Sequence, residues 1–127
     1  MGKKHIILVI DDQDGVRKLL AEVLRSDDRE IHLLNNGEEG MEFIRSTTPE
    51  LILLDMKMPG MSGLEVTREL KKAGFEGAII FMTAYGELEI ITEAKSLGIT
   101  AYINKPFDVN EIRNLVTGIL DGTFTRE

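Results

Sequence analysis

The sequence contains no cysteine and no tryptophan, and it has only three prolines among its 127 residues. Without cysteine the chain forms neither disulfide bonds nor thiolate zinc sites. No apolar run approaches the roughly 20 residues needed to cross a membrane, and the run at residues 6–10 is too short for a signal peptide. We therefore expect a cytoplasmic protein that does not bind a membrane.

Basic residues are also scarce. Fifteen lysines and arginines stand against 22 aspartates and glutamates, which gives a net charge of -7. Direct nucleic-acid binding needs a basic surface, so we expect none. Neither GxGxxG nor GxxxxGK with a following Ser or Thr comes after the first apolar run, which weighs against dinucleotide and P-loop nucleotide binding. The acidic balance suits a protein that binds a divalent cation or a basic partner surface.

Five short apolar runs alternate with longer amphipathic segments. The runs lie at residues 6–10, 31–34, 51–54, 78–82 and 101–103, and they are typical of strands buried on both faces of a sheet. The segments between them carry apolar residues at helical spacing, as at 16–24 and 112–120, and the pattern is least regular at 86–97. Three helix starts have capping-box patterns: Asn36 with Glu39, Ser62 with Glu65, and Asp108 with Glu111.

This alternation predicts an α/β fold with five βα units. The expected architecture is (βα)5, doubly wound and flavodoxin-like, with a five-stranded parallel sheet of order 2-1-3-4-5 and right-handed crossovers. A chain of this length fits one domain. We expect that domain to span residues 1–121, followed by a C-terminal tail over 122–127.

Polar residues follow four of the five predicted strands. They are Asp11 and Asp12 after the first strand, Asp55 after the third, Thr83 after the fourth and Lys105 after the fifth. Ligands of open doubly wound sheets bind outside the carboxyl ends of the strands, where the strand order reverses. The three aspartates should share one crevice there, with the threonine and the lysine on its other wall.

Such a group of side chains suits phosphoryl chemistry. Three neighbouring carboxylates repel one another unless a proton or a cation intervenes, and hard oxygen ligands favour Mg²⁺. A lysine ammonium and a threonine hydroxyl are suitable partners for phosphoryl oxygens. Each residue alone has an ordinary explanation as a turn, a cap or a solvated side chain, so the hypothesis depends on their joint placement.

These residues resemble the receiver domain of two-component response regulators. The resemblance covers nearly the whole chain and is carried by Asp11-Asp12, residues 53–63 (LLDMKMPGMSG), Met82-Thr83-Ala84 and Lys105-Pro106-Phe107. Among receivers, residues 11–13 and 82–88 are most similar to the single-domain type found in sporulation phosphorelays.

The resemblance implies a role for each site residue. Asp55 would accept a phosphoryl group from a partner's phosphohistidine. Asp12 and Asp55 would bind Mg²⁺ directly, Asp11 partly through water, and the backbone carbonyl of Lys57 would complete the protein ligands. Thr83 would donate a hydrogen bond to the phosphoryl oxygens, and Lys105 would form an ion pair with them.

The resemblance also implies a switch. A cis bond before Pro106 would aim the lysine inward, and Tyr102 would turn inward when Thr83 moves toward the phosphoryl group. This motion would reshape the face formed by the fourth helix, fifth strand and fifth helix. Lys57 and Tyr85 stand two positions after Asp55 and Thr83, where family members tune hydrolysis of the acyl phosphate.

The implied partners are a sensor histidine kinase or a histidine phosphotransfer protein, and a downstream protein target. The kinase would contact Gln13, Gly15 and Val16, together with the loop after Lys105. We expect a monomer, and dimerisation on phosphorylation stays open. The chain would act as an output switch or pass its phosphoryl group on.

Two alternatives differ in class from this interpretation. An aspartate-nucleophile phosphohydrolase characteristically has a second Asp two residues after the nucleophile, but that position is Lys57 here. A receiver-like binding module that is never phosphorylated would not need the complete set of site residues. We therefore expect a phosphoacceptor signalling domain rather than an enzyme, one that assists its own phosphorylation and slow dephosphorylation.

Overall fold

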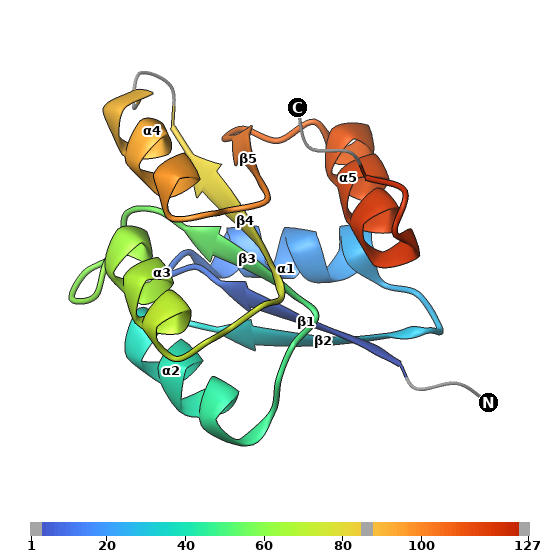
Figure 1. The fold of residues 1–127 in the computed structure, drawn as a ribbon. Helices are drawn as coiled ribbons and strands as arrows, with labels where there is room; N and C mark the ends of the chain where they lie inside the picture. Colours follow the sequence, from blue (N-terminus) through green and yellow to red (C-terminus); the bar gives the residue numbers. More distant parts are fainter. Residues whose placement is uncertain (1–3, 85–87, 125–127) are drawn as a thin grey trace.

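The computed structural model describes residues 4–84 and 88–124, in which strands and helices alternate (Figure 1). The elements are β1 (His5–Ile10), α1 (Asp14–Leu24), β2 (Arg29–Leu34), α2 (Gly37–Ser46), β3 (Leu51–Asp55), α3 (Gly63–Lys72), β4 (Ala78–Thr83), α4 (Leu88–Ser96), β5 (Ala101–Asn104) and α5 (Val109–Asp121). Every predicted apolar run is a strand, which extends past the run by one or two residues.

The strands form one parallel sheet in the order β2-β1-β3-β4-β5, as predicted. Ile10, the last residue of β1, pairs with Leu34 on one side and Leu54 on the other. The carboxyl ends of β1, β2 and β3 therefore lie level along one edge of the sheet. That edge carries the predicted site.

Helices cover both faces of the sheet. Helices α2, α3 and α4 pack on one face, while α1 and α5 pack on the other (Figure 1). Successive residues of a strand point to opposite faces, so Leu8 and Ile10 belong to the first core, and Ile7 and Val9 to the second. Burial on both faces explains why the central strands are continuous apolar runs.

The helix starts agree with their capping patterns in part. At Ser62 both hydrogen bonds of the capping box are present. At Asn36 the side chain accepts from the amide of Glu39, but the Glu39 carboxylate accepts from the amide of Asn35 instead. The Asp108 side chain accepts from the amide of Glu111, but the described residues show no return bond from the Glu111 carboxylate to the Asp108 amide. The Asn36 prediction was therefore half wrong, because the acid turns to the preceding loop residue.

The apolar stripe of α1 is narrower than its spacing predicts. Leu20 and Leu24 are fully buried in the second core, whereas Leu19 is 43% exposed. Within the described ranges, no helix combines the length and the apolar character that a membrane span requires.

Candidate functional site

Backbone hydrogen bonds continue beyond the strands and align the site residues along the carboxyl edge. The Asp11 amide donates to the Leu34 carbonyl at 3.1 Å, and the Lys105 amide donates to the Thr83 carbonyl at 2.7 Å. Because the sheet pattern extends through these loops, side chains far apart in sequence are held in one row.

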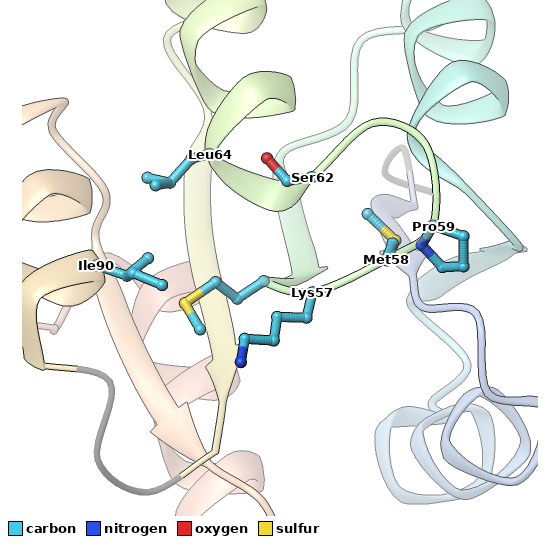
Figure 2. Close-up of a pocket in the computed structure, with 7 residues that line it drawn as sticks. Lys57, Met58, Pro59, Ser62, Leu64 and Ile90 are labelled. Atoms are coloured by element: carbon cyan, nitrogen blue, oxygen red, sulfur yellow. The ribbon is translucent and has the colours of Figure 1, made fainter.

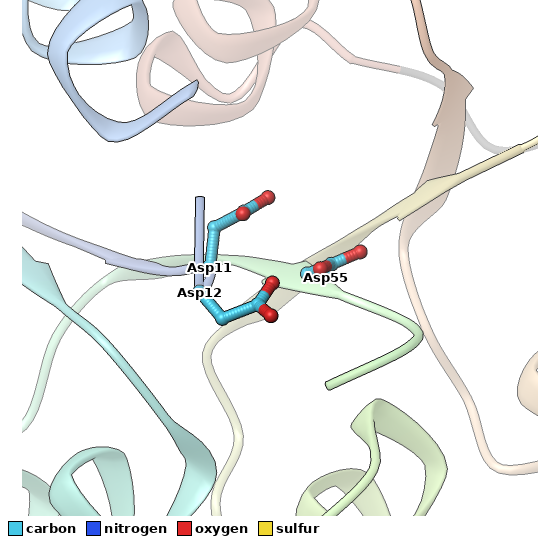
Figure 3. Close-up of side chains that lie close together, drawn as sticks. All are labelled: Asp11, Asp12 and Asp55. Carbon is cyan, nitrogen blue, oxygen red and sulfur yellow. The ribbon is translucent and has the colours of Figure 1, made fainter. Parts of the chain in front are cut away.

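The three aspartates form one acidic cluster. Asp11, Asp12 and Asp55 each offer a carboxylate oxygen, and these oxygens lie within 4.8 Å of one another (Figure 3). Asp11 and Asp55 are buried, while Asp12 is exposed. The cluster thus combines two shielded carboxylates with one that faces solvent.

Lys105 lies against the buried pair of carboxylates. Its Nζ atom is 2.8 Å from Asp11 Oδ2 and 3.3 Å from Asp55 Oδ1, and it also donates to Gln13 Oε1 at 3.4 Å. The Lys105–Pro106 peptide bond is cis, the geometry that the resemblance implied. The lysine thus contacts one carboxylate just after β1 and another at the end of β3.

The charge of Lys105 does not fully compensate the cluster. Burial and the neighbouring carboxylate of Asp11 raise the pKa of Asp55 from 3.8 to about 6, against the opposing effects of Lys105 and of the Lys57 backbone amide. A further cation beside Asp55 would favour its ionised form. The electrostatics of the described residues thus favour binding of a cation beside Asp55.

A cleft of about 270 Å³ opens over this cluster. It is lined by Asp12, Gln13, Asp55, Met56, Lys57, Met82, Thr83, Ala84 and Lys105. The Thr83 hydroxyl donates to the carbonyl of Ala84 at 2.8 Å, and its residue is almost fully buried. The structure therefore places Asp55, Thr83 and Lys105 around one small cavity.

A second hollow of about 430 Å³ adjoins the cleft between α3 and α4. Its lining residues are Met56, Lys57, Met58, Pro59, Ser62, Leu64 and Ile90 (Figure 2). Met56 and Lys57 line both cavities, but none of the carboxylates reaches this hollow. We therefore place the candidate chemistry in the smaller cleft.

Three further predicted residues, Gly15, Val16 and Tyr102, do not line the cleft. The predicted kinase contacts Gly15 and Val16 lie in the first turn of α1, beside the Gln13 that lines the cleft. Tyr102 is on β5 with 36% exposure, and Lys95 Nζ lies 5.4 Å from the centre of its ring. Tyr85 lies outside the described residues.

The structure adds Gly63 to the residues that shape the site. A Cβ atom at Gly63 would lie 2.6 Å from the backbone oxygen of Asp55 and 2.9 Å from the Cα atom of Met56. The Gly63 amide also donates to the Met56 carbonyl at 3.0 Å. The start of α3 thus packs directly on the end of β3. In the sequence, the signal is a glycine directly after the predicted N-cap Ser62.

Comparison with known proteins identifies the family. A family model described as the response regulator receiver domain matches residues 7–117. The chain belongs to this family. As a receiver, it is a phosphoacceptor signalling domain of two-component systems.

Two curated relatives differ in how much of their length this receiver spans. Sporulation initiation phosphotransferase F of Bacillus subtilis is 43% identical over 110 residues, which cover 87% of this receiver and 89% of that relative. Regulatory protein AtoC of Escherichia coli is 34% identical over 110 residues, but the receiver spans only 24% of its length. The likeness thus extends over nearly all of the first relative and about a quarter of the second.

Solved structures agree on the fold. A response regulator from Chloroflexus aurantiacus has a TM-score of 0.83 and 28% identity, covering 94% of this receiver and 99% of that chain. The signal receiver domain of a Luxo repressor protein from Vibrio parahaemolyticus has a TM-score of 0.88 at 22% identity, covering 94% and 92%. The second likeness concerns the fold alone.

Proposed function

We propose that this receiver accepts a phosphoryl group on Asp55 in a Mg²⁺-dependent reaction. The observation that carries the proposal is the placement of a buried Asp55 beside two further carboxylates, with Lys105 3.3 Å away and Thr83 on the wall of the same cleft. The relative from B. subtilis is named as a phosphotransferase of sporulation initiation. That name supports a place for this receiver in a phosphorelay.

The residues present fit Mg²⁺. Three carboxylate oxygens close together are hard ligands, and Mg²⁺ is usually bound by one or two carboxylates with several waters and a substrate phosphate. Asp12 and Asp55 would bind the ion directly, Asp11 partly through water, and the Lys57 carbonyl would add a further oxygen. When bound, the ion neutralises charge on the carboxylates and on the phosphoryl oxygens.

Phosphoryl transfer at this site needs positioning and charge neutralisation more than proton chemistry. A carboxylate oxygen of Asp55 attacks the phosphorus atom, and the donor leaves with the electron pair of its own bond to phosphorus. The Lys105 ammonium already lies beside the carboxylate and pairs with the incoming phosphoryl oxygens. The Thr83 hydroxyl exchanges its hydrogen bond to Ala84 for one to the phosphoryl group.

The chemical nature of the product tests this proposal. After incubation with acetyl phosphate and Mg²⁺, the protein should carry an acyl phosphate that hydroxylamine removes, and the resulting hydroxamate should map to Asp55. Phosphate that survives hydroxylamine would place the modification on another type of residue and contradict the proposal. Continuous release of phosphate from small phosphoesters would indicate a hydrolase instead.

The partner kinase or phosphotransfer protein should bind beside the cleft, at Gln13, Gly15 and Val16. Gln13 lines the cleft, and the exposed Leu19 lies one turn after Val16 on the same helix. We expect Val16→Ala to slow phosphoryl transfer from a cognate phosphohistidine protein by about tenfold, because apolar contacts at an interface are lost. Transfer from acetyl phosphate should not change, and an equal loss with both donors would contradict this assignment.

Lys57 and Tyr85 should set the lifetime of the phosphorylated state. The Lys57 side chain lines the cleft, where it hinders the approach of a water molecule to the phosphoryl group. The double substitution Lys57→Asn with Tyr85→Ala should therefore accelerate dephosphorylation severalfold, measured as loss of the acyl phosphate after removal of the donor. An unchanged rate would refute this role.

The output of the switch involves Tyr102. Its ring is exposed and lies under Lys95 in the structure. Movement of Thr83 toward the phosphoryl group frees space for the ring, and the face formed by α4, β5 and α5 then presents a different surface to a downstream protein. Only contacts that exist in the phosphorylated state drive this population shift.

A further inference from the structure

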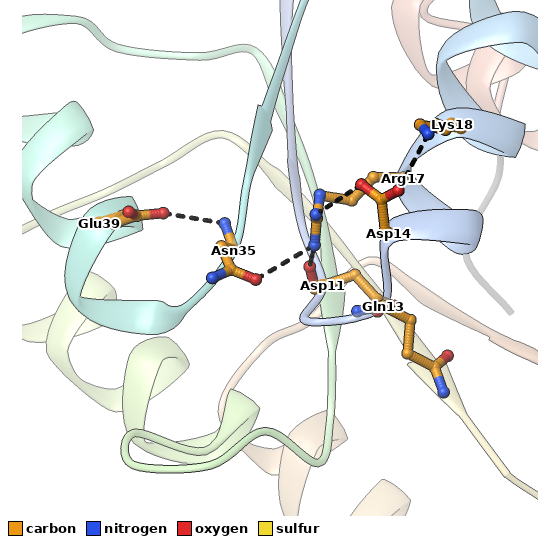
Figure 4. Close-up of polar contacts among 7 residues, drawn as sticks. All are labelled: Asp11, Gln13, Asp14, Arg17, Lys18, Asn35 and Glu39. Carbon is orange, nitrogen blue, oxygen red and sulfur yellow. Dashed lines mark hydrogen bonds and ion pairs between the residues drawn. The ribbon is translucent and has the colours of Figure 1, made fainter.

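The guanidinium group of Arg17 links the acidic cluster to the neighbouring β2–α2 loop. Its Nη1 atom donates to the backbone carbonyl of Asp11 at 2.7 Å and to Asn35 Oδ1 at 3.2 Å, and its Nη2 atom donates to Asp14 Oδ1 at 3.0 Å (Figure 4). The Arg17 side chain is only 16% exposed. The hydrogen bond to the Asp11 carbonyl is partly buried, whereas those to Asn35 and Asp14 are exposed.

Arg17 completes a set of contacts that hold Asp11. Asp11 Oδ1 accepts from the Gln13 amide at 2.8 Å, and Asp11 Oδ2 accepts from Lys105 at 2.8 Å. The Asp11 carbonyl and the Asp12 amide belong to one planar peptide group. The hydrogen bond from Arg17 consequently fixes the plane from which the Asp12 side chain projects.

Asp12 needs such support because the other two carboxylates of the cluster repel its side chain. Its carboxylate lies within 4.8 Å of two others, which repel it, and the residue is exposed rather than packed. Without a fixed backbone, rotation of the Asp11–Asp12 peptide would relieve the repulsion by turning the Asp12 carboxylate into solvent.

We propose that Arg17 is a positioning residue that preorganises Asp12 for Mg²⁺ by fixing the Asp11–Asp12 peptide to Asn35. The inference rests on the proposed function, in which the acidic cluster binds Mg²⁺. Asn35 is a suitable anchor, because its own amide donates to Glu39 Oε1 at 3.0 Å and so ties it to α2. Outer-shell partners of metal ligands commonly affect metal affinity by about 10- to 100-fold.

The geometry requires arginine at this position. One planar guanidinium reaches three acceptors, on the loops after β1 and β2 and at the first residue of α1, whereas a lysine ammonium is a compact charge without the planar fork of donors. Lysine at position 17 retains the positive charge but should therefore not restore the Mg²⁺ affinity. This distinguishes positioning from a general electrostatic effect of a nearby cation.

Two measurements test the inference on Arg17→Ala, Arg17→Lys and Asn35→Ala. Calorimetry gives the Kd for Mg²⁺. The Mg²⁺ concentration that gives half-maximal phosphorylation by acetyl phosphate is a second measure of Mg²⁺ affinity. Arg17→Ala and Arg17→Lys should each raise the Kd and the half-maximal Mg²⁺ concentration by about tenfold. Asn35→Ala should raise both about threefold. The phosphorylation rate at saturating Mg²⁺ should change much less. Arg25→Ala, which removes an exposed ion pair to Glu22 at 3.2 Å, should match the wild type.

The outcomes separate positioning from folding and from the proposed function itself. Wild-type values of both constants in Arg17→Ala, with only a lower unfolding temperature, would overturn the inference. Full rescue by Arg17→Lys would also overturn it. If Arg17→Ala does not fold, Arg17→Lys and Asn35→Ala decide the question. A wild-type protein that binds no Mg²⁺ would refute the proposed function and this inference together.

Discussion

Asp55→Asn is expected to stabilise the protein at neutral pH in the absence of Mg²⁺. Burial and the Asp11 carboxylate raise the pKa of Asp55 to about 6, so the ionised form is unfavourable in the folded protein despite the nearby Lys105. The difference from the ordinary value of 3.8 corresponds to about 1 to 3 kcal/mol, allowing for solvent at the open side of the cleft. Asparagine keeps the shape of the Asp55 side chain and removes its negative charge, so this cost is absent in the variant.

The sign of the pH dependence follows from linkage. Because its folded-state pKa is the higher one, Asp55 binds more protons in the folded protein between pH 4 and pH 6, and its own contribution to stability falls as pH rises through that window. The advantage of Asp55→Asn should therefore grow from about pH 4 to pH 6 and stay constant above. Urea unfolding across this range measures it.

A matched control and Mg²⁺ sharpen the stability test. Asp27→Asn, at an exposed turn position, removes one carboxylate away from the cleft and should not reproduce the effect. Millimolar Mg²⁺ should stabilise the wild type more than the Asp55→Asn variant, since the ion offsets the repulsion that the substitution removes. Equal stability of wild type and variant at pH 8 without Mg²⁺ would contradict this view of the electrostatics.

Gly63→Ala should damage both the fold and the phosphorylation site. The added Cβ would lie 2.6 Å from the Asp55 backbone oxygen and 2.9 Å from the Met56 Cα atom, which are backbone atoms that cannot turn aside. Helix α3 would have to move away from β3 and stretch the hydrogen bond between the Gly63 amide and the Met56 carbonyl. We expect a loss of about 1 to 3 kcal/mol in the free energy of unfolding.

The displaced carbonyl belongs to the proposed nucleophile, so phosphorylation should slow as well. The rate with acetyl phosphate should fall at least about tenfold, since small misplacements of reacting groups are costly. Gly118→Ala, within α5, is the matched control. A Cβ atom at Gly118 would lie 3.7 Å from its nearest neighbours, in Thr123 and Phe124, which is an ordinary van der Waals distance. That variant should be as stable as the wild type or slightly more so. A fully active Gly63→Ala protein of normal stability would contradict the packing argument.

The fold and the acidic cluster could be predicted because they depend on regular features. Continuous apolar runs identify strands buried on both faces, and five βα units imply the strand order in which β1 and β3 are neighbours. Once that order is known, Asp11, Asp12 and Asp55 must meet at one edge. The structure brings them together within 4.8 Å.

Other features could not be predicted because they depend on loop geometry and on which surface is covered. Helical spacing assigns Leu19 to the apolar stripe of α1, yet α5 does not cover it. The contact of Arg17 with the Asp11 carbonyl and Asn35 joins two loops whose relative position no sequence pattern specifies. Lys105 pairs with both Asp11 and Asp55, which only the packed site reveals.

Intact mass after incubation with acetyl phosphate tests the central claim most directly. The wild-type protein should gain one phosphoryl group in the presence of Mg²⁺ and none when the ion is chelated, and the Asp55→Asn variant should gain none under either condition. An adduct that persists in Asp55→Asn, or that forms equally well without Mg²⁺, would contradict the assignment of Asp55 as the phosphoacceptor of a Mg²⁺-dependent receiver.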